Sequence, residues 1–372
     1  MIGKSLSVTS PPEPWPDLGG HLRAILSLVL LGGCYEEVPE HPPCGVESSV
    51  FVTTDDGAVI HLHRHLAEGP VVLVVHGISS NHYCWDLDPE RSLGTYLAAR
   101  GFDTWLLDLR GHGDARLDPE GRDLDRRWVL DDYGLHDLPS AIAYVREATG
   151  AERVGYVGHS MGGMVAAIYA SHVGDDALWA LVAVGSPIDF SDPDPILALT
   201  RGSFDLSGRA LPMIATPPLA RVANAVGASL PVDVQDMLFV DIEPDAARRM
   251  MRTVVSPLWP GEMRQFARIV DTGRFGSYDG AHDYAADMAR ITVPTLVIAG
   301  RADRVASPDR VRGFYEAVGA TDKRFVVAGV ENGFAADYGH LDLPVGDHAP
   351  AEIYPLIGAW LREHSPVSGT NK

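Results

Sequence analysis

A buried strand that passes directly into a helix is the sequence feature that most constrains the fold of this chain. Residues 152–157 form a short apolar run with β-branched and aromatic residues, which is typical of a buried strand. Residues 161–170 are rich in Ala, Met and Val and contain no proline, as expected of a helix. Between them, Gly158-His159-Ser160-Met161-Gly162 predicts a sharp turn that strains the backbone of its central serine. Glycines two residues to either side relieve crowding, and Gly163 is expected to let the helix approach the sheet.

Strands and helices alternate along most of the remaining chain from about residue 48. Apolar or alternating runs predict further strands at 50–54, 59–64, 71–75, 102–107, 179–184, 295–299 and 324–327, and helices at 92–100, 137–149 and near the C-terminus. Asp55-Asp56-Gly57 predicts a hairpin between the first two strands. This order predicts an α/β fold with a mostly parallel eight-stranded sheet and helices on both faces.

The strand pattern stops between residues 188 and 289, after the sixth main strand. Helical patches at 219–228, 245–254 and 262–271 predict a helical cap over an active site. The apolar candidates to line an acyl pocket are Met213, Met237, Leu238, Phe239, Trp259 and Phe266. For any one of these residues, packing in the core of the cap is the favoured alternative. The expected domains are a signal or linker segment (1–47), two core parts (48–187 and 290–364), the cap (188–289) and a disordered tail (365–372).

Charge argues against nucleic acid as a partner. The chain of 372 residues carries 30 basic and 50 acidic residues, a formal net charge of −20, which repels a phosphate backbone. The sequence contains no D-x-D-x-D-G loop and no H-E-x-x-H helix, so it predicts no metal site.

The N-terminal segment resembles a bacterial lipoprotein signal. A short apolar stretch at 25–31 leads into Leu31-Gly32-Gly33-Cys34, which predicts that Cys34 is lipidated and anchors an exported protein to a membrane. Cys44 and Cys84 would then remain as a candidate disulfide pair. The alternative is a disordered tail with a fortuitous cysteine on a cytoplasmic protein.

Ser160 requires a base and an orienting carboxylate to act as a nucleophile at neutral pH. Asp303 follows the strand at 295–299 and therefore lies at the carboxyl edge of the sheet, where open α/β proteins build their sites. Asp189, Asp192 and Asp194, which follow the preceding strand, are minor alternatives for the acid.

His340, in Tyr338-Gly339-His340-Leu341-Asp342, is the leading candidate for the base because it follows the last strand, with His348 a weaker rival. His159 is expected to pack beside the serine without acting as its base. His61, His63 and His65 alternate along one strand, and without a partner pattern they are expected to be exposed strand residues.

Backbone N–H groups are the usual donors to the oxyanion that develops in acyl transfer. Met161, directly after the serine, is expected to supply one of them. Ile78, in the loop after the strand at 71–75, is expected to supply the other. The alternative is that His76-Gly77 marks an ordinary turn.

Taken together, His76-Gly77-Ile78, the segment at 108–113, the turn at Ser160, Asp303 and His340 resemble the α/β-hydrolase superfamily over about residues 48–364. Residues 91–111 and 338–342 are similar to the acid lipase family, and the first of these segments also resembles polyhydroxyalkanoate synthases. Those synthases carry cysteine where this chain has Ser160. The resemblance implies hydrolysis of small-molecule or lipid esters through an acyl-enzyme, without a cofactor.

Two other functions stay open at this point. The same triad would serve an acyltransferase or a thioesterase, which differ from an ester hydrolase only in the acceptor or donor of the acyl group. A protein with this fold that binds without catalysis is the third hypothesis, and the intact Ser160, Asp303 and His340 argue against it. The acyl chain length and the oligomeric state are not indicated by the sequence.

Overall fold

We analysed a computed structural model of the chain, which describes residues 45–116, 128–191 and 238–366. The chain divides into two units, residues 1–41 and 42–372, and all described elements belong to the second. Cys34 and Cys44 lie outside the described residues, as does most of the predicted tail, while Cys84 is buried. None of the helices described is long and apolar enough to cross a membrane.

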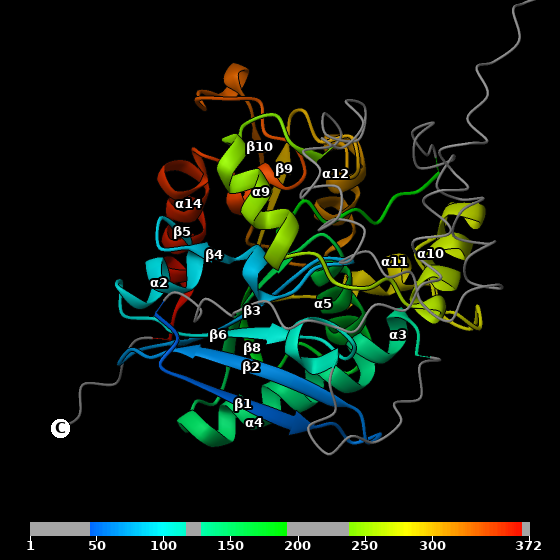
Figure 1. The fold of residues 1–372 in the computed structure, drawn as a ribbon. Helices are drawn as coiled ribbons and strands as arrows, with labels where there is room; N and C mark the ends of the chain where they lie inside the picture. The colour runs from blue at the N-terminus through cyan, green and yellow to red at the C-terminus, as the bar shows by residue number, and fades with distance from the viewer. Residues whose placement is uncertain (1–44, 117–127, 192–237, 367–372) are drawn as a thin grey trace, which may run out of the picture. The chain divides into compact units, whose positions relative to one another are not determined.

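Eight strands form one mixed sheet in the order β1-β2-β6-β3-β7-β8-β9-β10 (Figure 1). Their bounds are β1 Ser48–Thr53, β2 Val59–His65, β3 Val71–Val75, β6 Asp103–Asp108, β7 Val154–His159, β8 Leu178–Val184, β9 Thr295–Gly300 and β10 Lys323–Ala328. β1, β2 and β6 pair antiparallel, and all pairs from β6 to β10 are parallel. The predicted mostly parallel eight-stranded sheet is confirmed, and each strand lies within two residues of its predicted position.

Helices cover both faces of this sheet because its inner strands are apolar on both sides. In β3, for example, Val71, Leu73 and Val75 pack in one core cluster, whereas Val72 and Val74 pack in the other. The first cluster lies against α4 (Leu138–Thr149), α5 (Met161–His172) and α12 (Pro308–Ala317), and the second against α2 (Leu93–Ala98) and α14 (Ala349–His364). Nearly every residue of α5 is buried, so this helix is enclosed by the core.

The described part of the predicted cap contains α9 (Pro244–Thr253), α10 (Pro260–Thr272) and α11 (Tyr284–Asp287). The first two match predicted helical patches, and the patch at 219–228 lies outside the described residues. Of the pocket candidates, Phe239 and Trp259 are buried in the two core clusters, and Leu238 and Phe266 pack against them. Met213 and Met237 also fall outside the described residues. The described candidates therefore pack in the two core clusters that they share with the sheet, and not in a separate core of the cap.

The remaining described elements are short. They are β4 (Asp86–Asp88) paired with β5 (Arg91–Ser92), α3 (Leu130–Asp132), α13 (Asp342–Val345), the 3₁₀ turns η1 (His82–Cys84), η2 (Gly113–Arg116), η4 (Met288–Arg290) and η5 (Val330–Asn332), and one π-helical segment, η3 (Tyr133–Asp137). The sequence did not predict them, because segments of two to five residues carry no readable periodicity.

The prediction that the β2 histidines are exposed is wrong. His61, His63 and His65 are each at most 4% exposed. Each ring lies against a carboxylate from outside β2: Asp114 for His61, Asp108 for His63 and Asp86 for His65. Alternation along the strand correctly put the three rings on one face, but the loops that cover this face come from distant parts of the sequence.

Candidate active site

Ser160 lies at the sharp turn between β7 and α5, as predicted. Its backbone has φ 51° and ψ −117°, and Ser79 is the only other non-glycine residue with positive φ in the described ranges. The Ser160 N–H donates to the carbonyl of Val184 on β8 at 2.8 Å, which ties the turn to the neighbouring strand. A strained conformation held by its surroundings is typical of a functional residue.

Three glycines allow this turn. A Cβ on Gly158 would lie 2.5 Å from the backbone carbon of Gly162, and one on Gly162 would lie 2.7 Å from the carbonyl oxygens of Val75 and His76. A Cβ on Gly163 would lie 2.5 Å from the Cβ of Ser186, just after β8. The expectation that Gly163 lets α5 approach the sheet is confirmed.

Asp303 and His340 meet at the carboxyl edge of the sheet. Asp303 follows β9 and His340 precedes α13, and their Oδ2 and Nδ1 atoms are 2.7 Å apart. The other carboxylate oxygen accepts the N–H groups of Val305 at 2.8 Å and Ala306 at 2.7 Å. Because a carboxylate accepts, Nδ1 of His340 carries the proton and Nε2 keeps a free lone pair.

Ser160 and His340 both lie close to the residues at the end of β8. Val184 accepts the N–H of Ser160, and a Cβ on the next residue, Gly185, would lie 3.5 Å from Cε1 of His340. Ser160 Oγ and His340 are not hydrogen-bonded to each other in the described structure. Contacts of this kind are often loose without substrate and tighten in the complex.

The predicted oxyanion loop lies directly against the serine. A Cβ on Gly77 would lie 3.1 Å from Cβ of Ser160, so the backbone that carries Ile78 approaches the turn closely. Met161 is the first residue of α5, where backbone N–H groups have no acceptor within the helix. Gly77, the neighbour of Ile78, and Met161 therefore both lie next to Ser160.

Buried histidines hold both ends of this loop. At its start, His76 donates from Nδ1 to the carbonyl of Gly77 at 2.7 Å and accepts the N–H of Leu109 at Nε2. Burial lowers the pKa of His76, which keeps its ring neutral as this pair of bonds requires. At its end, Nδ1 of His82 donates to Asp108 at 2.9 Å. The loop is therefore fixed to the end of β6.

The other candidates for the acid and the base that the structure describes, Asp189 and His348, pair with other groups. Asp189 is exposed and accepts the N–H of Ser191, while Asp192 and Asp194 lie outside the described residues. His348 pairs with Asp241 at 2.8 Å and is exposed. His159 is buried beside the serine, and its Nε2 donates to the carbonyl of His340 at 3.0 Å. Burial, with a smaller effect of His340, keeps the pKa of His159 well below its usual value.

Sequence reasoning missed a role for Asp342. Its Oδ2 accepts the N–H groups of Gly339 at 2.8 Å, Val240 at 2.6 Å and Asp241 at 3.1 Å. One buried carboxylate therefore joins the His340 loop to the segment that precedes α9. The only signal in the sequence was its position two residues after the candidate base, which says nothing of a partner a hundred residues away.

Residues 70–343 match the family model described as alpha/beta hydrolase fold, and the chain belongs to this family. It is 26% identical over 337 residues to the poly(3-hydroxyalkanoate) polymerase subunit PhaC of Allochromatium vinosum, covering 86% of this chain and 89% of that protein. It is 25% identical to lipase 1 of Drosophila melanogaster, covering 76% and 71%. An esterase structure from Thermogutta terrifontis matches with a TM-score of 0.56 at 20% identity, covering 86% of this chain and all of that one.

The family assignment confirms the predicted fold and the predicted relation to lipases and esterases. Its relatives include both ester hydrolases and a polymerase, so they support a hydrolase or an acyl-transferring enzyme as the class of this protein.

Proposed function

We propose that the protein is a serine hydrolase of carboxylic, lipid-like esters that works through an acyl-enzyme. The observation that carries the proposal is the 2.7 Å contact of His340 with Asp303 at the sheet edge where the strained Ser160 projects. Ser160 Oγ attacks the ester carbonyl while Nε2 of His340 takes its proton. Asp303 orients the imidazole and stabilises its protonated form.

The backbone N–H groups of Ile78 and Met161 stabilise the oxyanion of each tetrahedral intermediate. His340 then returns its proton to the leaving alcohol, which departs and leaves the acyl group on Ser160. Water, deprotonated by the same imidazole, releases the acid and regenerates the serine. These reaction steps need no cofactor, since every proton moves between named side chains and the reactants.

Ser160→Ala tests the proposal directly. We expect kcat/KM for p-nitrophenyl esters to fall by a factor of about 10³ or more, because the nucleophile is removed while the fold is kept. Wild-type protein should also react stoichiometrically with a fluorophosphonate probe at this serine. The matched control is Ser171→Ala on α5, where a buried serine donates only to the helix backbone. Equal turnover by Ser160→Ala, or no labelling of the wild type, would overturn the enzymatic proposal.

An acyltransferase or a thioesterase is the second candidate, favoured by the match to a polymerase subunit over 86% of the chain. Partition of the acyl group between water and added alcohols, measured with ester and thioester donors, separates these activities. A product ratio that favours the alcohol well beyond its molar share would make acyl transfer the main reaction. Esters of increasing chain length in the same assay define the acyl group.

We also propose that the protein is exported and attached to a membrane through a lipidated Cys34. The sequence pattern before this cysteine supports the proposal. Mass spectrometry of the native protein is expected to find Cys34 as a diacylglycerol-modified N-terminus. A native protein that begins at Met1 with an unmodified Cys34 would contradict it and favour a cytoplasmic location.

A further inference from the structure

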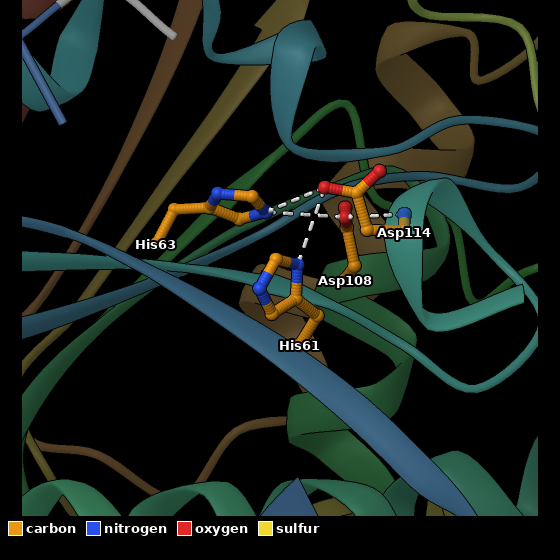
Figure 2. A group of neighbouring side chains, drawn as sticks. All are labelled: His61, His63, Asp108 and Asp114. Atoms are coloured by element: carbon orange, nitrogen blue, oxygen red, sulfur yellow. Dashed lines mark hydrogen bonds and ion pairs between the residues drawn. The ribbon is translucent and has the colours of Figure 1, made fainter. Parts of the chain in front are cut away.

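A group of two histidines and two aspartates lies outside the candidate active site, where β2 and β6 meet the turn η2. We call it the His–Asp cluster: His61, His63, Asp108 and Asp114. Figure 2 shows both rings directed at Asp114, and the ring of His63 directed also at Asp108. His61 and His63 share one face of β2, and His61 is paired in register with Asp108 on β6. Asp114 reaches the cluster from η2.

The distances in the cluster fit ligands of one ion better than hydrogen bonds. His61 Nδ1 is 3.3 Å and His63 Nε2 is 3.9 Å from Asp114 Oδ2, and His63 Nε2 makes only a long hydrogen bond of 3.4 Å to Asp108 Oδ2. Charge-assisted hydrogen bonds measure about 2.7–2.9 Å. In the same protein, His340–Asp303 at 2.7 Å and His82–Asp108 at 2.9 Å have distances in this range.

Tetrahedral zinc with bonds of about 2.0–2.2 Å separates neighbouring ligand atoms by roughly 3.3–3.6 Å. One ligand atom from each of the four residues lies within 4.8 Å of every other, which is close to the spacing that a single ion requires.

Unpartnered polar atoms at the cluster give independent support. His61 and His63 are at least 96% buried, and Nδ1 of His61, which faces Asp114, makes no hydrogen bond. A buried ring nitrogen without a partner is destabilising, whereas a metal–nitrogen bond would satisfy it. Asp108 is buried and Asp114 is about one-third exposed, and a bound cation would offset the repulsion between these two neighbouring carboxylates.

The structure assigns the His–Asp cluster as a site for a divalent transition-metal ion, and zinc fits best. Two imidazoles and two carboxylates in a buried setting suit zinc, while magnesium and calcium prefer all-oxygen sites. Asp114 is about one-third exposed and provides the route of entry. The sequence predicted no metal here because the two carboxylates follow the histidines by 45 residues or more and form no ligand motif.

His82 supports the cluster from the outer shell. It donates from Nδ1 at 2.9 Å to Asp108 Oδ2, which also accepts the Asp114 N–H at 3.1 Å, and from its backbone N–H at 2.7 Å to Oδ1. Such bonds orient a ligating carboxylate. Because His82 ends the loop that begins at His76, a bound ion would stabilise β2, η2 and this loop together. The assignment concerns structure and does not depend on ester hydrolysis.

The test is zinc binding by the full-length chain after treatment with a chelator. We expect one Zn²⁺ per chain by calorimetric titration and elemental analysis, and a thermal midpoint that rises with free Zn²⁺. Replacement by Co²⁺ should give the intense visible absorption of a tetrahedral site. His61→Gln and Asp114→Asn, which nearly conserve shape, should weaken Zn²⁺ binding by at least roughly ten-fold, since even outer-shell changes weaken it roughly 10–100-fold.

His172→Gln is the matched control, because His172, His282 and Asp287 form a more exposed group at an open cavity of about 410 Å³. This variant should bind Zn²⁺ as the wild type does. The assignment is overturned if the wild type binds no stoichiometric Zn²⁺, if Asp114→Asn and His61→Gln bind it as tightly as the wild type, or if only His172→Gln loses it. The Co²⁺ spectrum of the wild type decides the matter if a variant fails to fold.

Discussion

At the scale of single residues, Glu262 shows how burial changes the chemistry of a side chain. It lies in the first turn of α10, where its Oε2 accepts the N–H of Trp259 at 3.3 Å, and its Oε1 lies 3.7 Å from Nε2 of His112. Burial raises the pKa of Glu262 to about 8 and lowers that of His112 to about 3. Both groups are therefore neutral at pH 7.

A raised pKa in the folded state makes stability depend on pH. The stabilising protonated form is fully present below the usual pKa near 4.5, and its contribution is lost as pH rises to about 8. Glu262→Gln, which stays neutral, should therefore be more stable than the wild type above pH 5. The difference in free energy of unfolding should grow to a few kcal/mol at pH 9.

Urea denaturation of Glu262→Gln and wild type at pH 5, 7 and 9 checks this expectation. The control is Glu316→Gln, which removes the same charge from an exposed position on α12 and should change stability little. A difference between Glu262→Gln and wild type that is constant from pH 5 to pH 9 would contradict the argument.

At the scale of elements, α5 can follow β7 so abruptly because it approaches β8 at glycine. Gly163→Ala would place a Cβ 2.5 Å from Cβ of Ser186, a buried residue. Although alanine favours a helix more than glycine, the overlap forces α5 or β8 to move. We expect the free energy of unfolding to fall by roughly 1–3 kcal/mol.

A double-mutant cycle isolates this contact. Ser186→Gly removes the opposing side chain, so the pair Gly163→Ala with Ser186→Gly should be more stable than the two single effects predict. Denaturation curves of the four proteins measure the coupling. Strict additivity would show that the close packing of α5 on β8 is not what requires glycine at position 163.

At the scale of the whole molecule, Arg110 joins three distant parts of the chain. It pairs bidentately with Asp56 in the β1–β2 turn, at 2.6 and 2.8 Å, and with Asp137 before α4, at 2.7 Å. Its side chain is only 5% exposed. Burial raises the pKa of Asp137 to about 6 even beside this cation.

Arg110→Met should lower the free energy of unfolding by about 3–5 kcal/mol near pH 8, because it leaves Asp137 buried without a cation. The loss should be smaller near pH 4.5, where the folded protein protonates Asp137. The comparison is Arg301→Met. Arg301 pairs with the exposed Glu331, and removing this pair should change the free energy of unfolding by less than about 1 kcal/mol. Similar losses in the two variants would refute a special role for the buried network.

Local patterns were sufficient to predict the eight strands, because each is a run of apolar or alternating residues and needs no knowledge of its partners. They also predicted the turn at Ser160, since a strand followed at once by a helix leaves few conformations for the residue between them. Asp303 was selected because it follows a strand that ends at the carboxyl edge of the sheet. The order serine, acid, histidine came from the resemblance to α/β-hydrolases.

Tertiary structure alone decided which side chains those elements meet. The alternation of His61, His63 and His65 placed the rings on one face, but whether that face meets water or carboxylates depends on loops that the chain brings from elsewhere. The same applies to Asp342, which binds segments far apart in sequence. Periodicity records which way a side chain points, whereas its partner, its burial and its protonation depend on contacts made only when the chain has folded.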